Sequence, residues 1–245
     1  MAELFAQEGA KVLAVDLSEY KLMAAFGASS AIRALRQDVT AGDAADTLVG
    51  TIQSELDGLD ILVNNAGVPG DLGPIEETSD ASWARVFSVN VDAVFRISRA
   101  CIPLLRESAY GRIITTSSVN VDFGLRRYGP YVASKHAVSG LMKGLPIELG
   151  RNGITVNCIN PANVVTGMTR SGFPAPNTAE GRAYLDAATV LNRSCQQEEV
   201  VSAAVFLASD GGAYITGQAI VVDGGMTCRL PSLSERAIRE IQRVT

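Results

Sequence analysis

The chain has 245 residues, of which 47% are hydrophobic and 19% are charged, and its formal net charge is −5. This length suits one α/β domain of the larger kind, and the apolar content is enough to fill its core. The charge is spread without a basic cluster, which argues against nucleic acid as a partner. The apolar runs are far too short to cross a bilayer, so no membrane partner is expected.

The four cysteines do not form a recognisable site. Cys101, Cys158, Cys195 and Cys228 are scattered, without the CxxC or Cys/His spacing of a metal centre. Thiols placed in this way are typical of a reducing compartment, and no targeting segment is visible. We therefore expect no resident metal and a cytoplasmic location.

The first elements are a helix over residues 1–8 and a buried strand over residues 11–16. Asp16 ends this strand. A carboxylate there can bind the ribose hydroxyls of a dinucleotide, or it can cap the helix expected near Ser18. Both interpretations are open at this point. In a parallel α/β chain a strand and a loop should precede the first helix, and the sequence shows neither.

Strands and helices alternate through the rest of the chain. Further strands are predicted at residues 59–64, 112–117, 155–160 and 218–223, and residues 31–40 supply a short strand and a turn. Further helices are predicted at residues 44–56, 131–149 and 198–209, and residues 79–107 are long enough for two helices or one kinked helix. Residues 163–193 read as a loop with short helices that covers a pocket, and residues 226–245 as a polar tail. The alternation predicts a doubly wound parallel sheet between two helix layers, in a single α/β domain of residues 1–245.

Polar side chains recur where these elements begin or end. Asn65-Ala66-Gly67 follows a buried strand, and small residues there allow a ligand to approach the backbone. Asn90 lies inside the apolar stripe of a helix, where asparagine is disfavoured, so it is either exposed or has a polar task. Ser118 lies at the carboxyl edge of the sheet, where open α/β sheets bind ligands.

Tyr131 and Lys135 are four residues apart, so in a helix they lie on one face. An ammonium near a phenol favours the phenolate, which predicts a lowered pKa for Tyr131 and a group able to exchange a proton with a carbinol or carbonyl oxygen. Taken alone, this spacing is common and favours an ordinary pair whose polar ends reach solvent at a helix start.

Together these residues resemble the short-chain dehydrogenase/reductase family, and the resemblance covers almost the whole chain. It rests on Asp16, Asp38-Val39, Asn64-Asn65-Ala66-Gly67, Asn90, Ser118, Tyr131-x-x-x-Lys135, Asn160-Pro161, Thr166 and Val222-Asp223-Gly224-Gly225. The resemblance implies a Rossmann-like fold and hydride transfer between a nicotinamide cofactor and a secondary alcohol or ketone.

The resemblance also implies a role for each matched residue. Tyr131 would exchange the proton, Lys135 would lower its pKa and hold the nicotinamide ribose, Ser118 would orient the substrate oxygen, and Asn90 would hold a relay water. The cofactor would contact Asp16, Leu17, Asp38, Val39, Asn65, Ala66, Gly67, Tyr131, Lys135, Pro161, Ala162, Val164 and Thr166. Asp16 repels a 2′-phosphate, and Leu17 stands where NADP-preferring relatives often have arginine, so NAD is favoured over NADP.

Two features depart from the family pattern. The first strand and the glycine-rich turn that binds the pyrophosphate are absent, and that strand would lie between residues 11–16 and 61–64. Ala162-Asn163 also replaces the usual Pro-Gly-Pro. A serine hydrolase is set aside, because the single histidine, His136, directly follows Lys135 and no Gly-x-Ser-x-Gly is present.

The sequence therefore supports two functional hypotheses. The first is an NAD-dependent oxidoreductase acting on an apolar, alicyclic secondary alcohol or ketone; the second is a non-catalytic oligomerising or regulatory protein of the same fold. Family members usually form dimers or tetramers through helices matching residues 79–107 and 131–149, so a homodimer or homotetramer is expected.

Overall fold

The structure is a computed structural model that describes residues 1–165 and 177–228. Its strands are β1 (Val12–Asp16), β2 (Ile32–Arg36), β3 (Ile61–Asn64), β4 (Arg112–Thr116), β5 (Thr155–Pro161) and β6 (Ala219–Val222). Its helices are α1 (Ala2–Gln7), α2 (Glu19–Phe26), α3 (Ala44–Glu55), α4 (Asp80–Phe87), α5 (Ala93–Glu107), α6 (Gly129–Leu149), α7 (Ala179–Ala188) and α8 (Gln197–Ala208).

All strand pairs are parallel, as the alternation of elements predicted. Four strands form one sheet in the order β3-β4-β5-β6, and β1 and β2 form a second sheet. Because the strands of the larger sheet run in one direction, Asn64, Thr116 and Pro161 end at the same edge. This carboxyl edge carries the residues that matter for function.

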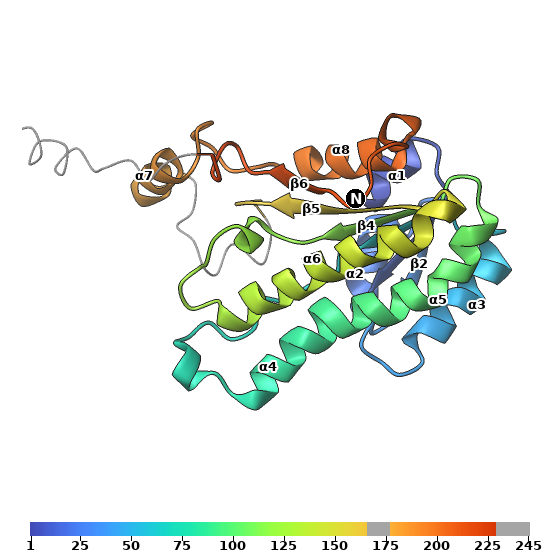
Figure 1. The fold of residues 1–245 in the computed structure, drawn as a ribbon, viewed down its shortest axis with the longest axis horizontal. Helices are drawn as coiled ribbons and strands as arrows, with labels where there is room; N and C mark the ends of the chain where they lie inside the picture. Colours follow the sequence, from blue (N-terminus) through green and yellow to red (C-terminus); the bar gives the residue numbers. More distant parts are fainter. Residues whose placement is uncertain (166–176, 229–245) are drawn as a thin grey trace, which may run out of the picture.

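Helices cover both faces of the larger sheet in a three-layer α/β/α arrangement (Figure 1). On one face, α3, α5 and α6 pack their apolar side chains against Ile113, Val156 and Cys158. On the other face, α1 and α8 pack against Ile114 and Ile159. The fold is therefore the predicted Rossmann-like α/β fold.

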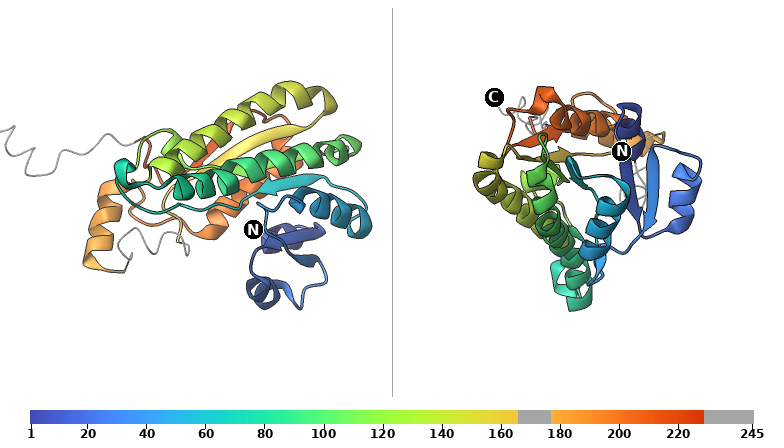
Figure 2. Two further views of the ribbon diagram at one scale, coloured as in Figure 1. Left: turned by 90° about the horizontal axis from the view of Figure 1, so that it is seen from below. Right: turned by 90° about the vertical axis from the view of Figure 1, so that its right-hand side faces the viewer.

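The two sheets are separated at the position where the sequence predicted an absent strand (Figure 2). Within the described residues β1 pairs only with β2, and β3 pairs only with β4. Backbone groups of Val12 and Asp16 bond toward β2, so by alternation those of Leu13 and Val15 point away from it, toward the space before β3. A cavity of about 1270 Å³ occupies this space and reaches the carboxyl edge of the sheets.

Candidate active site

The cavity wall brings together residues that lie far apart in the sequence. It includes Asp16, Leu17, Asp38, Val39, Asn65, Ala66, Gly67, Ser118, Tyr131, Lys135, Pro161, Ala162 and Val164, all of them predicted site residues. Asn90 lies behind this wall, and Thr166 lies outside the described residues. Met168 and Phe173, expected in the loop over the pocket, also lie outside them.

Lys135 is buried on α6 and is fixed by a backbone oxygen. Its Nζ donates a hydrogen bond of 2.7 Å to the carbonyl oxygen of Thr116, the last residue of β4. The same Nζ lies 5.6 Å from the centroid of the Tyr131 ring. The predicted helical pairing of Tyr131 and Lys135 is therefore present, with the ammonium over the ring face.

The pKa shifts differ from the prediction for Tyr131. Burial raises the pKa of Tyr131, and a hydrogen bond with Ser118 opposes this only in part. The prediction that Lys135 lowers the pKa of the Tyr131 phenol was therefore wrong for this structure. Burial also lowers the pKa of Lys135 to about 8, because the charged form is poorly solvated. For both groups, burial is the largest cause of the shift in pKa.

Asn90 has the polar task that the sequence left open. It lies in a π-helical turn, Ser88–Asp92, between α4 and α5, and its side chain is 1% exposed. Its Oδ1 accepts a 2.8 Å bond from the Val68 amide, and its Nδ2 donates to Val68 O at 3.0 Å and to Ser134 Oγ at 2.9 Å. Asn90 thus ties the loop after β3 to α6, one residue before Lys135.

Ser118 is buried at the end of β4, with its hydroxyl next to another polar side chain. Ser118 Oγ donates to Asn120 Oδ1 at 3.0 Å and accepts from the Asn120 backbone amide at 3.2 Å. Tyr131 lies in the same part of the wall and interacts with the Ser118 hydroxyl. Three of the four predicted catalytic side chains, Ser118, Tyr131 and Lys135, therefore lie in the wall of one cavity, and the fourth, Asn90, does not line it.

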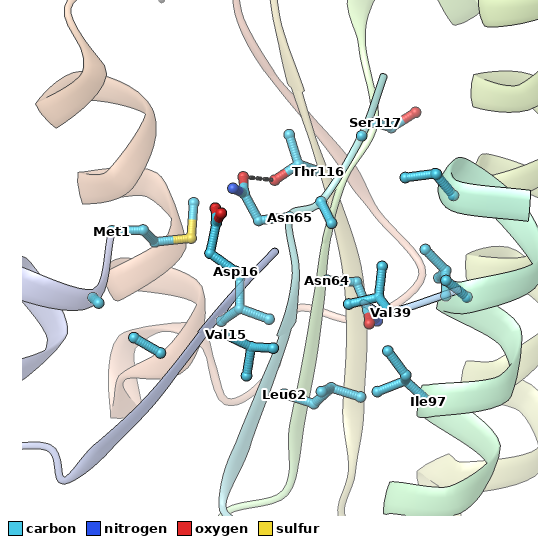
Figure 3. A pocket seen from close by; sticks show the side chains of 18 of the residues that line it. Met1, Val15, Asp16, Val39, Leu62, Asn64, Asn65, Ile97, Thr116 and Ser117 are labelled. Atoms are coloured by element: carbon cyan, nitrogen blue, oxygen red, sulfur yellow. Dashed lines mark hydrogen bonds between the residues drawn. The ribbon is translucent and has the colours of Figure 1, made fainter. Parts of the chain in front are cut away.

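Asp16 at the end of β1 and Asn65 after β3 point into the cavity from facing walls (Figure 3). Asp16 is exposed at the end of β1, where its Oδ1 accepts from the Ser18 amide at 2.8 Å. The side chain of Ser18, not that of Asp16, caps α2 by accepting from Lys21 N. Across the cavity Asn65 Oδ1 accepts from Thr116 Oγ1 at 2.9 Å. Asp16 is thus free of the capping role that the sequence left open.

Asp38 lies on the loop after β2. Its Oδ1 accepts hydrogen bonds from the Thr40 hydroxyl at 2.7 Å and from the Thr40 amide at 2.9 Å. These bonds lower the pKa of Asp38, so the carboxylate is charged near neutral pH. The Asp38 carboxylate, held in this position, is a suitable hydrogen-bond acceptor for the amino group of a nucleotide base.

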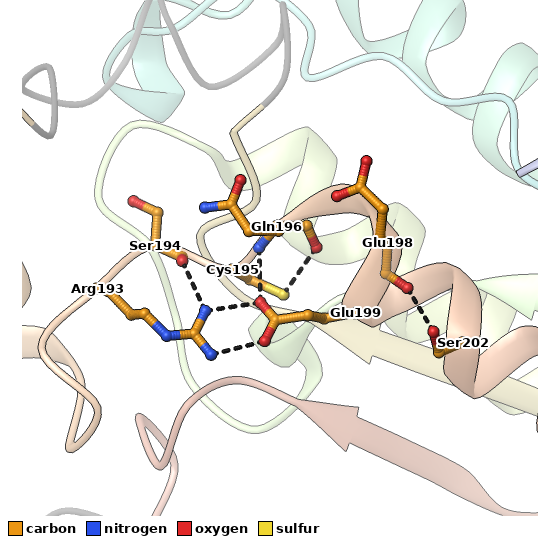
Figure 4. A network of polar contacts seen from close by, with 7 residues as sticks. All are labelled: Arg193, Ser194, Cys195, Gln196, Glu198, Glu199 and Ser202. Carbon is orange, nitrogen blue, oxygen red and sulfur yellow. Dashed lines mark hydrogen bonds and ion pairs between the residues drawn. The ribbon is translucent and has the colours of Figure 1, made fainter.

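The segment after β5 is held in place by the start of α8. Val164 forms an isolated parallel bridge with Cys195, and Gln197 Nε2 donates to Val165 O at 2.9 Å. Around Cys195, the Arg193 guanidinium bonds both oxygens of Glu199, and Glu199 Oε2 accepts from the Gln196 amide (Figure 4). This network fixes the backbone that carries Val164 at the cavity wall.

The hydrogen-bonding groups in the cavity wall fit the nucleoside parts of a nicotinamide dinucleotide. Asp16 offers a carboxylate for vicinal ribose hydroxyls, and Tyr131 and Lys135 offer donors at the opposite end. A Cβ at Gly67 would lie 3.6 Å from Lys135 Nζ, so the glycine keeps the space beside the ammonium open. Within the described residues, no glycine-rich turn faces the cavity to bind the diphosphate.

Comparisons with known proteins agree with this architecture. A family model described as enoyl-(acyl carrier protein) reductase matches residues 1–227. Cyclopentanol dehydrogenase of Comamonas testosteroni is 37% identical over 228 residues, which cover 91% of this chain and 90% of that protein. The chain belongs to the short-chain dehydrogenase/reductase family.

Solved structures agree with this assignment. The 3-ketoacyl-(acyl-carrier-protein) reductase of Brucella melitensis, complexed with NADH, has a TM-score of 0.84 and 28% identity, covering 92% of this chain and 91% of its own. The gluconate 5-dehydrogenase of Burkholderia cenocepacia, in complex with NADP and tartrate, has a TM-score of 0.84 and 28% identity, covering 94% and 90%. One neighbour thus holds NADH and the other NADP.

Sequence reasoning missed several polar residues of the site. Thr116 supplies the acceptor for Lys135, and Ser134 supplies the acceptor for Asn90. Tyr128 and Asn120 line the cavity beside Tyr131 and Ser118. Their positions next to the predicted residues were visible in the sequence, but hydroxyls and amides are common in such segments and no pattern marked them.

Proposed function

We propose that this protein transfers a hydride between NAD(H) and a secondary alcohol or ketone. The observation that carries the proposal is the convergence of Ser118, Tyr131 and Lys135 in one cavity wall at the carboxyl edge of the sheet. Membership of an oxidoreductase family supports it, and so do alcohol-oxidising relatives such as cyclopentanol dehydrogenase.

Each side chain has a definite task in this proposal. The cofactor supplies the hydride acceptor or donor. Ser118 orients the substrate oxygen, and the Tyr131 hydroxyl exchanges the proton with that oxygen. Because burial raises the pKa of Tyr131, the phenol is protonated at neutral pH and is ready to donate to a carbonyl oxygen. Reduction of a ketone is therefore favoured near neutral pH, and oxidation of an alcohol at higher pH.

Lys135 and Asn90 position the reacting groups. Lys135 would hold the nicotinamide ribose from its bond to Thr116 O. Asn90 fixes the loop before Val68 against Ser134, and it would also hold the relay water that passes protons to Lys135. In the same proposal, Asp16 and Leu17 favour NAD over NADP, since a carboxylate at the ribose repels a 2′-phosphate.

The substrate end of the cavity supports an alicyclic substrate. Val119, Phe123 and Leu125 contribute apolar side chains to the wall of the cavity that Tyr131 also lines, and a relative named cyclopentanol dehydrogenase supports a cyclic alcohol as substrate. A homodimer or homotetramer is part of the proposal, because Phe95 on α5 and Ile147 on α6 are 45% and 85% exposed.

A cytoplasmic location is also part of the proposal, because unpaired cysteines fit a reducing compartment. Among the described residues no helix is long and apolar enough to span a membrane.

A second candidate is a non-catalytic oligomerising or regulatory protein. The open space between β1 and β3 favours it, because half of the cofactor wall lies on a sheet of only two strands.

One experiment separates the two candidates. NADH is titrated into the chain while energy transfer from its single tryptophan, Trp83, is followed, and turnover is then assayed with a panel of cyclic ketones. Saturable binding that excess NAD displaces, together with turnover, supports the oxidoreductase. A compact fold by circular dichroism with no binding supports the non-catalytic protein.

A further inference from the structure

The cavity wall beside Ser118 carries a second polar group that the proposed reaction leaves without a role, the carboxamide of Asn120. This residue lies in the short 3₁₀ turn Val119–Val121 and is 7% exposed. It lines the cavity, and its Oδ1 accepts the Ser118 hydroxyl proton at 3.0 Å. Within the described part of the chain, its Nδ2 donates to no acceptor.

The pairing of Ser118 with Asn120 has a consequence for substrate binding. A serine hydroxyl has one proton, and here that proton is directed to Asn120 Oδ1. When Ser118 donates instead to a substrate oxygen, Asn120 Oδ1 loses its donor, and the Asn120 side chain is only 7% exposed. An unpaired buried acceptor is costly, so a substrate that brings its own hydroxyl to Asn120 binds better than one that does not.

The distance between the Ser118 hydroxyl oxygen and Asn120 Oδ1 fits one class of substrate. Ser118 Oγ and Asn120 Oδ1 are 3.0 Å apart. Two oxygens on adjacent carbons can lie about as close as hydrogen-bonded oxygens, roughly 2.8 Å. One oxygen can then bond Ser118 while its neighbour donates to Asn120 Oδ1 and accepts from Nδ2.

We propose that Asn120 selects substrates with a hydroxyl group on the carbon next to the reacting one, namely vicinal diols in oxidation and α-hydroxy ketones in reduction. The proposal rests on the function proposed above and narrows its substrate class. In oxidation, one carbinol carbon loses a hydride to NAD and its hydroxyl proton goes to Tyr131, which leaves an α-hydroxy ketone. The second hydroxyl stays intact on Asn120.

The test compares cis-1,2-cyclohexanediol with cyclohexanol, two rings that differ by one hydroxyl. We expect kcat/KM for the diol to exceed that for cyclohexanol at least about tenfold, since the analogue leaves a buried polar group unpaired. Asn120→Ala should remove this preference, so that the kcat/KM values for the diol and for cyclohexanol come within about threefold of each other. Asn152→Ala, at an exposed asparagine in the turn after α6, is the matched control and should keep the preference.

Calorimetric dissociation constants for the same two alcohols separate this inference from the proposed function. Turnover with equal kcat/KM values, or a diol preference that survives in Asn120→Ala, overturns the inference and leaves the oxidoreductase intact. Selective diol binding that is lost in Asn120→Ala, without turnover, overturns the oxidoreductase and supports the inference. Neither turnover nor selective binding overturns both.

Discussion

Replacing Lys135 by methionine is expected to stabilise the fold near neutral pH while removing turnover. Lys135 is 4% exposed, and burial lowers its pKa from 10.5 to about 8. Each pKa unit corresponds to about 1.4 kcal/mol, so the charged form costs the folded state about 3 kcal/mol. Methionine removes this cost but leaves Thr116 O without its donor, a loss of about 2 kcal/mol. The net gain expected at pH 7 is about 1 kcal/mol.

The pH dependence of this gain tests the reasoning more sharply than its size. Above about pH 8 the folded chain has released the Lys135 proton, while the unfolded chain still binds it. The stability that Lys135 contributes therefore rises with pH, and it is lost as the pH falls through 8. Between pH 7 and about pH 9.5 the wild type should gain about 2 kcal/mol that Lys135→Met lacks.

Urea unfolding of both proteins at the two pH values measures this difference. Lys143→Met serves as the control, because Lys143 is an exposed residue on the same helix, and its difference from wild type should stay constant. If the Lys135→Met difference is also the same at both pH values, Lys135 carries a well-stabilised charge and the argument from desolvation is refuted.

Three further outcomes are expected. Asp16→Ala should narrow the preference for NAD over NADP, because it removes a charge that repels the 2′-phosphate. If the ratio of kcat/KM with NAD to kcat/KM with NADP is unchanged, Asp16 does not set this preference. Tyr131→Phe should abolish hydride transfer with little change in NADH affinity in the titration above; undiminished turnover would exclude the phenol as proton donor. In hydrogen exchange, the Leu13 and Val15 amides should exchange much faster than the Ile113 amide in the centre of the larger sheet, because they face the cavity and no strand among the described residues pairs with them on that side. Equal protection would mean that the two sheets are joined in solution.

The strands and helices were predictable because their apolar patterns are strong and their ends are marked. At the starts of α2, α4 and α7, the side-chain oxygens of Ser18, Ser79 and Thr178 each accept a hydrogen bond from a backbone amide. Serine and threonine are common at this capping position. The observed bounds of five strands lie within two residues of the predicted ones, and β2 ends at Arg36, inside the segment 31–40 that was predicted as a short strand and a turn. Among the residues that the structure describes, no strand lies between β1 and β3, as predicted from the strand order that the family resemblance implied.

Details of the site were less predictable because they depend on burial and on local backbone geometry. The pKa of Tyr131 was predicted from the spacing to Lys135 alone, whereas the desolvation that raises it comes from the surrounding fold. The π turn that turns Asn90 toward Val68 and Ser134 has no clear sequence signal. The bond between Ser118 and Asn120 depends on the turn that follows β4, and a sequence shows only that the two residues are close.

The two halves of the site lie on parts of the fold that differ in how firmly their strands are held by packing. Ser118 and Lys135 are tied to β4 and α6, which pack in the main core, whereas Asp16 lies on a two-stranded sheet whose inner edge faces the cavity. Two strands alone are marginally stable, so β1 depends for its position on α1 and α2 and on the packing of Leu13 and Val15 against the main core. A perturbation of β1 should therefore alter cofactor affinity and the NAD preference first. The geometry among Ser118, Tyr131 and Lys135 should change only when the larger sheet is disturbed.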